Sequence, residues 1–118
     1  MLDFKTDLAK IIDRLKFDSN GLIPAVAQDF QTKQVLMLAW VNKESIELSL
    51  KTGFATYFSR SRQQIWQKGS TSGNLQKIVE IYSDCDYDAI IFLVEQFGPA
   101  CHTGEKSCFF HRISPLQP

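Results

Sequence analysis

Short apolar stretches separated by turn residues constrain the fold of this chain more than any other sequence feature. Several of these stretches are rich in β-branched and aromatic residues, which are typical of strands. We predict strands at residues 22–27, 34–41, 54–60, 64–68, 76–82, 89–95 and 107–113. Two segments have helical features instead: residues 4–17, where apolar side chains recur on one helix face, and residues 43–52, between the N-cap candidate Asn42 and the C-cap candidate Gly53.

This pattern predicts an α+β fold that is richer in strand than in helix. At 118 residues the chain is long enough for one hydrophobic core but not for two, so we expect a single domain over residues 1–118. No apolar stretch approaches the roughly 20 residues that span a bilayer, and the first residues lack the features of a signal peptide. We therefore expect a cytoplasmic protein.

The charge balance and the cysteine count narrow the possible partners. With 13 basic and 13 acidic residues the net charge is zero, so we expect neither a nucleic-acid nor a membrane partner. The 3 cysteines are an odd number in a chain without a signal peptide, which argues against a disulfide framework.

The segment 84–108 combines all of the cysteines with one histidine and three closely spaced carboxylates. Thiolates prefer a soft cation such as zinc, whereas clustered carboxylates prefer a hard cation such as magnesium. The candidate metal ligands are Cys85, Cys101, Cys108, Asp84, Asp86 and Asp88. Because the cysteine spacing does not match a CxxC zinc knuckle, three free, half-buried thiols remain the alternative.

The three aspartates also have the spacing of the first ligands of an EF-hand, with Glu95 at the last ligand position. We reject this interpretation because Ala89 occupies the position that requires glycine, and the following residues are too apolar for a calcium loop. If the segment is extended, the three carboxylates project to one side and Cys85 to the other. A solvated acidic turn between two strands is the alternative.

A cationic cluster occupies residues 59–62 and continues into a glycine-containing loop at residues 66–74. Two arginines, a lysine, hydroxyl groups and accessible backbone amides suit an anionic small molecule. The segment is not a P-loop, because it lacks the strand–GxxxxGK[ST]–helix pattern. The candidate substrate-binding residues are Arg60, Arg62, Trp66, Lys68, Thr71 and Ser72, although Trp66 could pack in the core instead.

The two histidines have different surroundings in the sequence. His102 lies between the candidate ligand Cys101 and a turn that contains Gly104, so we favour it as a proton-transfer group near neutral pH. His111 follows two phenylalanines in an apolar stretch, where we expect a structural histidine.

Three motifs, at residues 66–74, 84–88 and 98–109, together resemble the signature of the phosphoribosyl-AMP cyclohydrolase family. The resemblance covers about residues 20–113, and members of this family catalyse the third step of histidine biosynthesis. In many bacteria the cyclohydrolase is fused to a C-terminal pyrophosphohydrolase, whereas here we expect only the cyclohydrolase domain.

The resemblance implies an intertwined homodimer with one zinc ion and one magnesium ion per subunit. The zinc ligands carry over to Cys85 from one subunit and to Cys101 and Cys108 from the other. The magnesium ligands carry over to Asp84, Asp86 and Asp88.

The implied reaction is hydrolysis of the N1–C6 bond of the adenine ring in 1-(5-phosphoribosyl)-AMP, which opens the ring and gives a phosphoribosylformimino-AICAR-phosphate. Alkylation at N1 makes C6 electrophilic, and zinc supplies a hydroxide nucleophile at neutral pH. We expect His102 to move the protons. We expect the basic residues, together with magnesium, to hold the two phosphates: Arg60, Arg62 and Lys68.

Two other functions compete with this one. A non-catalytic, metal-stabilised nucleotide-binding dimer would keep the fold without turnover. A zinc nucleobase deaminase attacks the same kind of carbon, but it normally has HxE and PCxxC motifs, and neither occurs in this sequence. The candidate ligands, the histidine and the basic cluster together favour catalysis.

Overall fold

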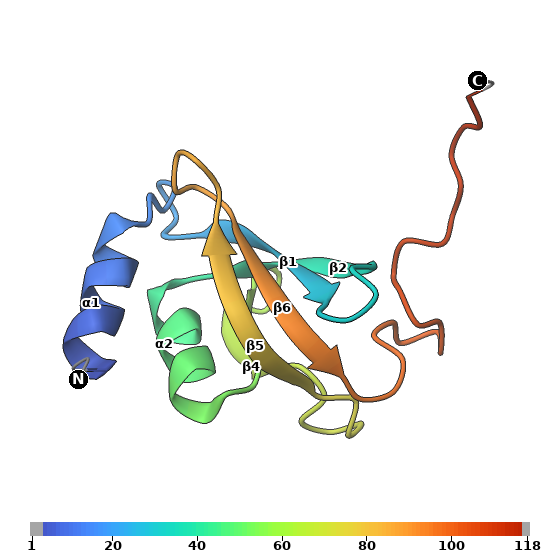
Figure 1. Cartoon of the computed structure of the whole chain (residues 1–118), viewed down its shortest axis with the longest axis horizontal. Helices are drawn as coiled ribbons and strands as arrows, with labels where there is room; N and C mark the ends of the chain where they lie inside the picture. The colour runs from blue at the N-terminus through green and yellow to red at the C-terminus, as the bar shows by residue number, and fades with distance from the viewer. Residues whose placement is uncertain (1–3, 117–118) are drawn as a thin grey trace.

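A mixed β-sheet forms the body of the protein, and both helices lie at one end of it (Figure 1). The computed structural model describes residues 4–116, so residues 1–3 and 117–118 of the predicted domain lie outside the described part. The elements in chain order are α1 (Phe4–Arg14), β1 (Ile23–Asp29), β2 (Val35–Val41), α2 (Lys43–Thr52), β3 (Thr56–Ser59), β4 (Gln64–Gln67), β5 (Gln76–Ser83) and β6 (Ile90–Gln96). This is the strand-rich α+β fold that the sequence predicts.

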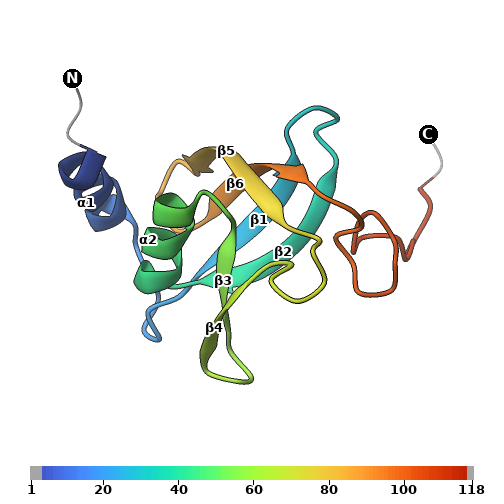
Figure 2. The same ribbon diagram turned by 90° about the horizontal axis from the view of Figure 1, so that it is seen from below.

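The six strands are ordered β4-β3-β2-β1-β6-β5, and the only parallel pair among them is β1 with β6. The sheet curls strongly (Figure 2). The Ala55 N–H donates to the Gln76 carbonyl at 2.9 Å, and the Ile78 N–H donates to the Gly53 carbonyl at 2.8 Å. These bonds connect the start of β5, at one end of the sheet, to the segment that leads into β3 near the other end.

The core lies inside this curled sheet. Alternate residues of β1 point into it and pack against β6, as a half-buried strand requires. The buried Tyr57 hydroxyl donates to Gln76 Oε1 at 2.6 Å, and Gln76 Nε2 donates to Gln96 Oε1 at 2.9 Å. The core therefore contains a chain of polar groups that satisfy one another, as buried polar groups must.

Helix α2 begins and ends where the sequence predicts. Asn42 Oδ1 accepts from the Ser45 N–H at 2.8 Å, and Ser45 Oγ accepts from the Asn42 N–H at 2.9 Å, which forms a reciprocal capping box. Gly53 ends the helix with a φ of 84°, a left-handed conformation that glycine adopts without a steric penalty.

Helix α1 ends at Arg14, before the predicted boundary at residue 17. The Leu15 N–H bonds to the Ile12 carbonyl at 3.1 Å, and the Lys16 N–H bonds to the Tyr87 carbonyl at 2.7 Å. The Lys16 N–H therefore bonds to the turn between β5 and β6 and does not continue the hydrogen bonding of the helix. Within residues 4–116, no helix combines the length and the apolar character that a membrane span requires.

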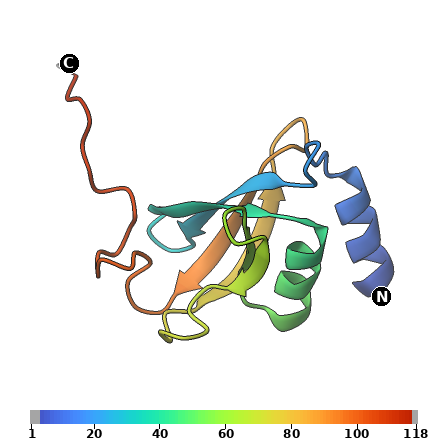
Figure 3. The same cartoon turned by 180° about the vertical axis from the view of Figure 1, so that it is seen from behind.

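The predicted strand at residues 107–113 is wrong. The Cys108 N–H donates to the Leu36 carbonyl at 2.7 Å, and Ser107 Oγ donates to the Val35 carbonyl at 2.7 Å. These bonds hold the segment at the start of β2, but no ladder continues beyond Cys108, and the chain then leaves the sheet (Figure 3). A β-branched, aromatic composition is not sufficient for a strand when no neighbouring strand pairs with it.

Candidate active site

The loop after β6 brings a cysteine and a histidine to one cavity of about 320 Å³, and the loop after β4 adds a lysine. The cavity lies between this loop and the glycine-containing loop after β4. Its lining residues are Lys68, Ser72, Asn74, Pro99, Ala100, Cys101, His102 and Gly104. Four residues that the sequence analysis selected therefore meet here: Lys68, Ser72, Cys101 and His102.

Backbone hydrogen bonds fix the shape of the loop at residues 100–106. The Ala100 N–H donates to the Lys106 carbonyl at 3.1 Å, and the Cys101 N–H donates to the Glu105 carbonyl at 3.1 Å. Lys68 Nζ donates to the Ala100 carbonyl from across the cavity. The lysine ammonium group is thus held beside Cys101, where its charge favours a thiolate.

The thiols of Cys101 and Cys108 interact with each other and differ in acidity. Thr103 Oγ1 donates to Cys101 Sγ at 3.1 Å, and this hydrogen bond, with smaller effects from Cys108 and Lys68, lowers the pKa of Cys101. Burial, followed by the neighbouring Cys101, raises the pKa of Cys108. Two adjacent thiols, one of which has a lowered pKa, form a donor set that fits zinc.

Two glycines allow the loop at residues 69–74 to pack closely beside this cavity. A Cβ at Gly69 would lie 2.3 Å from the backbone carbonyl carbon of Asn74, and a Cβ at Gly98 would lie 2.3 Å from Asn74 Oδ1. Both glycines also have positive φ values, 80° and 74°. No other residue fits either position without moving Asn74, which was not selected from the sequence and which lines the cavity.

A second cavity, of about 440 Å³, lies at the β3–β4 hairpin and contains both arginines of the cationic cluster. Its lining residues are Ala39, Trp40, Phe58, Ser59, Arg60, Ser61, Arg62, Gln64 and Trp66. The Arg60 guanidinium lies 4.4 Å from the centre of the Trp40 ring, a cation–π contact. Sequence reasoning missed Trp40. No local sequence signal indicated it, because its position near Arg60 depends on the pairing of β2 with β3, which sets Trp40 opposite Phe58.

Trp66 lies between the core and the second cavity. Its ring centre lies 5.1 Å from that of Tyr57, so one side of the indole packs against the core while the other lines the second cavity. Lys68 lies in the turn that follows β4 and lines the first cavity instead. Thr71 is exposed and lines neither of these two cavities.

The acidic segment is an exposed turn between β5 and β6, so the extended conformation considered for it does not occur. Asp84 Oδ1 accepts from the Asp88 N–H at 3.0 Å, and Tyr87 has a φ of 62°, which reverses the chain. The Asp84 side chain thus accepts a backbone N–H that, in an extended segment, a neighbouring strand would accept. Asp84, Asp86 and Asp88 are exposed, and each offers a carboxylate oxygen within 4.8 Å of the other two.

The three carboxylates of this turn interact strongly with one another. Burial acts to raise the pKa of Asp84, but hydrogen bonds from Asp88 and Asp86 lower it overall. The pKa of Asp88 is raised by hydrogen bonds to Asp84 and then Asp86, with a further contribution from their negative charges. Three hard oxygen donors whose negative charges lie close together fit a divalent cation such as magnesium.

Cys85 and the acidic turn precede β6, whereas Cys101 and Cys108 follow it (Figure 1). The 7 residues of β6 separate these groups by roughly 20 Å at the rise of a strand. A single chain therefore does not bring the three cysteines together.

The two histidines also differ in the structure. His102 is exposed at the cavity that contains Cys101, where a proton-transfer group has access to both water and a ligand. His111 is exposed as well, with its ring centre 4.4 Å from that of Phe110. The expected structural role of His111 is therefore wrong, because no sheet neighbour covers the segment that carries it.

Comparison with known proteins identifies clear relatives. The sequence profile of the phosphoribosyl-AMP cyclohydrolase family matches residues 37–110. A phosphoribosyl-AMP cyclohydrolase from Archaeoglobus fulgidus is 62% identical over 99 residues, which cover 84% of this chain and 92% of the relative. One from Methanospirillum hungatei is 57% identical over 84% of this chain and 76% of the relative. The histidine biosynthesis bifunctional protein HisIE from Caldanaerobacter subterraneus is 60% identical over 84% of this chain and 48% of its own length.

These similarities, with a cavity that combines thiol, imidazole and ammonium groups, define the protein as an enzyme of the hydrolase class. The chain belongs to the phosphoribosyl-AMP cyclohydrolase family, and its place is in histidine biosynthesis. The resemblance in the three sequence motifs is thereby confirmed.

Proposed function

We propose that the protein acts as a homodimer that hydrolyses the N1–C6 bond of the adenine ring in 1-(5-phosphoribosyl)-AMP, with zinc and magnesium as cofactors. The observation that carries this proposal is the arrangement of the cysteines. Cys101 and Cys108 form a thiol pair beside a histidine and a lysine, and Cys85 lies at the opposite end of β6. We place the reaction in the cytoplasm, where thiol ligands stay reduced.

The proposed zinc ligands are Cys101 and Cys108 of one subunit and Cys85 of the partner subunit. The lowered pKa of Cys101 supports this assignment, because the thiolate is the form that binds a metal. When bound, zinc makes water a nucleophile near neutral pH. Three protein ligands leave a fourth position open, as in catalytic zinc sites.

His102 is the proposed proton-transfer residue. Hydrolysis adds water to C6 of the ring, breaks the N1–C6 bond and delivers a proton to the departing N1. The imidazole at the mouth of the cavity can take the proton from water and return it to N1, because an imidazole nitrogen can both accept and donate a proton.

The remaining candidate residues position the two phosphates of the substrate. Arg60, Arg62 and the indole of Trp66 line one cavity, and Lys68 lines the other. The three aspartates of the acidic turn would hold magnesium, which supplies positive charge for a phosphate. Contacts at both ends of a long substrate fix the ring over the reacting groups, which lowers the barrier by reducing the entropy lost on reaction.

The proposed homodimer follows from the separation of the cysteines along β6. A two-fold symmetric dimer that joins Cys85 of one subunit to Cys101 and Cys108 of the other forms two equivalent sites. Neither site is complete in the monomer.

The direct test is to incubate the purified protein with phosphoribosyl-AMP, zinc and magnesium and to follow the ultraviolet change on ring opening. We expect turnover that a chelator abolishes and that zinc restores. Cys101→Ala should lose activity and bound zinc, as measured by elemental analysis, whereas the control Gln31→Ala, at an exposed position of the β1–β2 turn, should keep both. Nucleotide binding without turnover would instead support the non-catalytic, metal-stabilised dimer.

A further inference from the structure

The segment at residues 109–116 exposes a row of apolar side chains. Ile113 is 98% exposed and Leu116 is 88% exposed, and Phe109 and Phe110 are exposed as well. The segment leaves the sheet after Cys108 and extends away from the rest of the protein (Figures 1 and 3). Apolar side chains gathered on one exposed segment indicate a surface that covers them.

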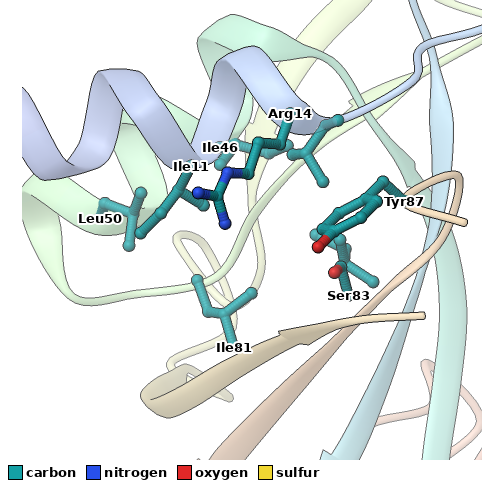
Figure 4. A pocket seen from close by; sticks show the side chains of 9 residues that line it. Ile11, Arg14, Ile46, Leu50, Ile81, Ser83 and Tyr87 are labelled. Carbon is teal, nitrogen blue, oxygen red and sulfur yellow. The ribbon is translucent and has the colours of Figure 1, made fainter. Parts of the chain in front are cut away.

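A matching surface exists at the opposite end of the same chain. An apolar pocket of about 260 Å³ lies between α1, α2 and the β5–β6 hairpin (Figure 4). Its apolar lining residues include Ile11, Leu15, Ile46, Leu50, Ile81 and Tyr87. Ile11 is 53% exposed at the open side, so the pocket is accessible from solvent.

The topology separates this pocket from the chain's own 109–116 segment. Tyr87 lines the pocket and belongs to the turn before β6, whereas Phe109 follows the loop after β6. The length of β6 lies between them, and the segment runs away from the pocket. The 109–116 segment of a second copy of the chain is not separated from the pocket in this way.

The zinc site proposed above brings the segment and the pocket together across two subunits. If Cys108 of one subunit meets Cys85 of the partner subunit, the segment that begins at Phe109 starts beside the partner's Tyr87, two residues from the shared ligand. Eight extended residues reach up to roughly 25 Å, which is enough to cross the pocket. The segment carries Arg112 and no acidic residue, so it brings no negative charge to the turn of three aspartates beside which it starts.

We propose that residues 109–116 of each subunit pack into the apolar pocket between α1, α2 and the β5–β6 hairpin of the other subunit. This inference rests on the proposed homodimer and identifies the surface that holds the two subunits together around the metal sites. By symmetry both segments are exchanged. Ile113 and Leu116 bury their side chains, and the pocket loses its exposed apolar lining.

A cross-linking experiment tests where the segment lies. A photoreactive phenylalanine analogue at position 113 is introduced into unlabelled protein, which is mixed with ¹⁵N-labelled wild-type protein under conditions that allow subunit exchange. Irradiation should yield mixed-isotope peptides that join position 113 to α1, α2 or the β5–β6 hairpin. Cross-links that lie only within one chain, or on another surface, would overturn the proposal.

Matched variants test whether the contact stabilises the dimer. Ile113→Glu should raise the dimer dissociation constant by about tenfold or more, because burying an aliphatic side chain is worth at least that factor. Ser114→Glu adds the same charge at the neighbouring exposed position and should change it little. On the pocket side, Ile11→Glu should weaken the dimer and the exposed Ala9→Glu should not. Equal dissociation constants within both pairs would refute the contact.

The outcomes separate this inference from the proposed function. A protein that stays monomeric with zinc present would contradict the homodimer, and with it the exchanged segment. A dimer with intact shared sites whose position 113 is cross-linked elsewhere would contradict the exchanged segment alone.

Discussion

Subunit complementation tests the shared metal site more directly than any single variant. Cys85→Ala removes the ligand at one end of β6, and Cys108→Ala removes a ligand at the other end. Each variant alone should form dimers in which both sites lack a ligand, so each should be inactive.

The expected recovery follows from counting the sites. After random exchange of equal amounts, about half of the dimers contain one subunit of each kind. In such a dimer one site combines the intact Cys85 of one subunit with the intact Cys101 and Cys108 of the other, while the second site lacks two ligands. With one active site in half of the dimers, the mixture should recover about one quarter of the wild-type activity.

A matched control uses Cys101→Ala mixed with Cys108→Ala. These two cysteines contact each other in the same chain, so both sites of a mixed dimer still lack one ligand, and no activity should return. The assays are ring opening by ultraviolet absorbance and zinc content, with subunit exchange confirmed by mass spectrometry. Recovery in the control, or no recovery in the test mixture after confirmed exchange, would refute the shared site.

Three further predictions address the core, the thiols and the cationic cavity. Tyr57→Phe leaves the buried Gln76 Oε1 without its donor and should lower the free energy of unfolding by about 1–3 kcal/mol, measurable by urea denaturation; an unchanged midpoint would contradict this. In metal-free protein Thr103→Val should raise the pKa of Cys101, so that its alkylation by iodoacetamide shifts to higher pH; an unshifted profile would exclude the hydrogen bond as the cause. Trp40→Leu removes the ring that holds a guanidinium at the second cavity and should raise KM severalfold with a smaller effect on kcat, whereas Trp40→Phe should keep most of the affinity.

The elements that depend on local signals were predictable from the sequence. Helix α2 is an example, because Asn42 and Gly53 define both of its ends through groups close by in the chain. Six of the predicted strands also occur near their expected positions, because the apolar stretches and the turn residues between them are local features of the sequence. The strand expected at residues 107–113 was not predictable in this way, since pairing depends on a neighbour that the local sequence does not reveal.

The candidate site was predictable in residue type but not in arrangement. The sequence selected Cys101 and His102 from their chemistry, and the structure brings them to one cavity. It did not indicate Trp40, whose relation to Arg60 depends on the pairing of β2 with β3. The conformation of the acidic turn was also missed, because it depends on hydrogen bonds between the Asp84 side chain and the backbone rather than on strand alternation.

The parallel pairing of β1 with β6 has a consequence for how the protein folds. Ala25 pairs with Ile90, so the centre of the sheet closes only after most of the chain has been synthesised. Contacts between residues so distant in sequence slow folding, because loop-closure entropy must be lost before they form. Cys85 and Cys101 flank β6 on its two sides, so the same late event positions both. We therefore expect metal uptake to follow the rate-limiting folding step rather than to guide it.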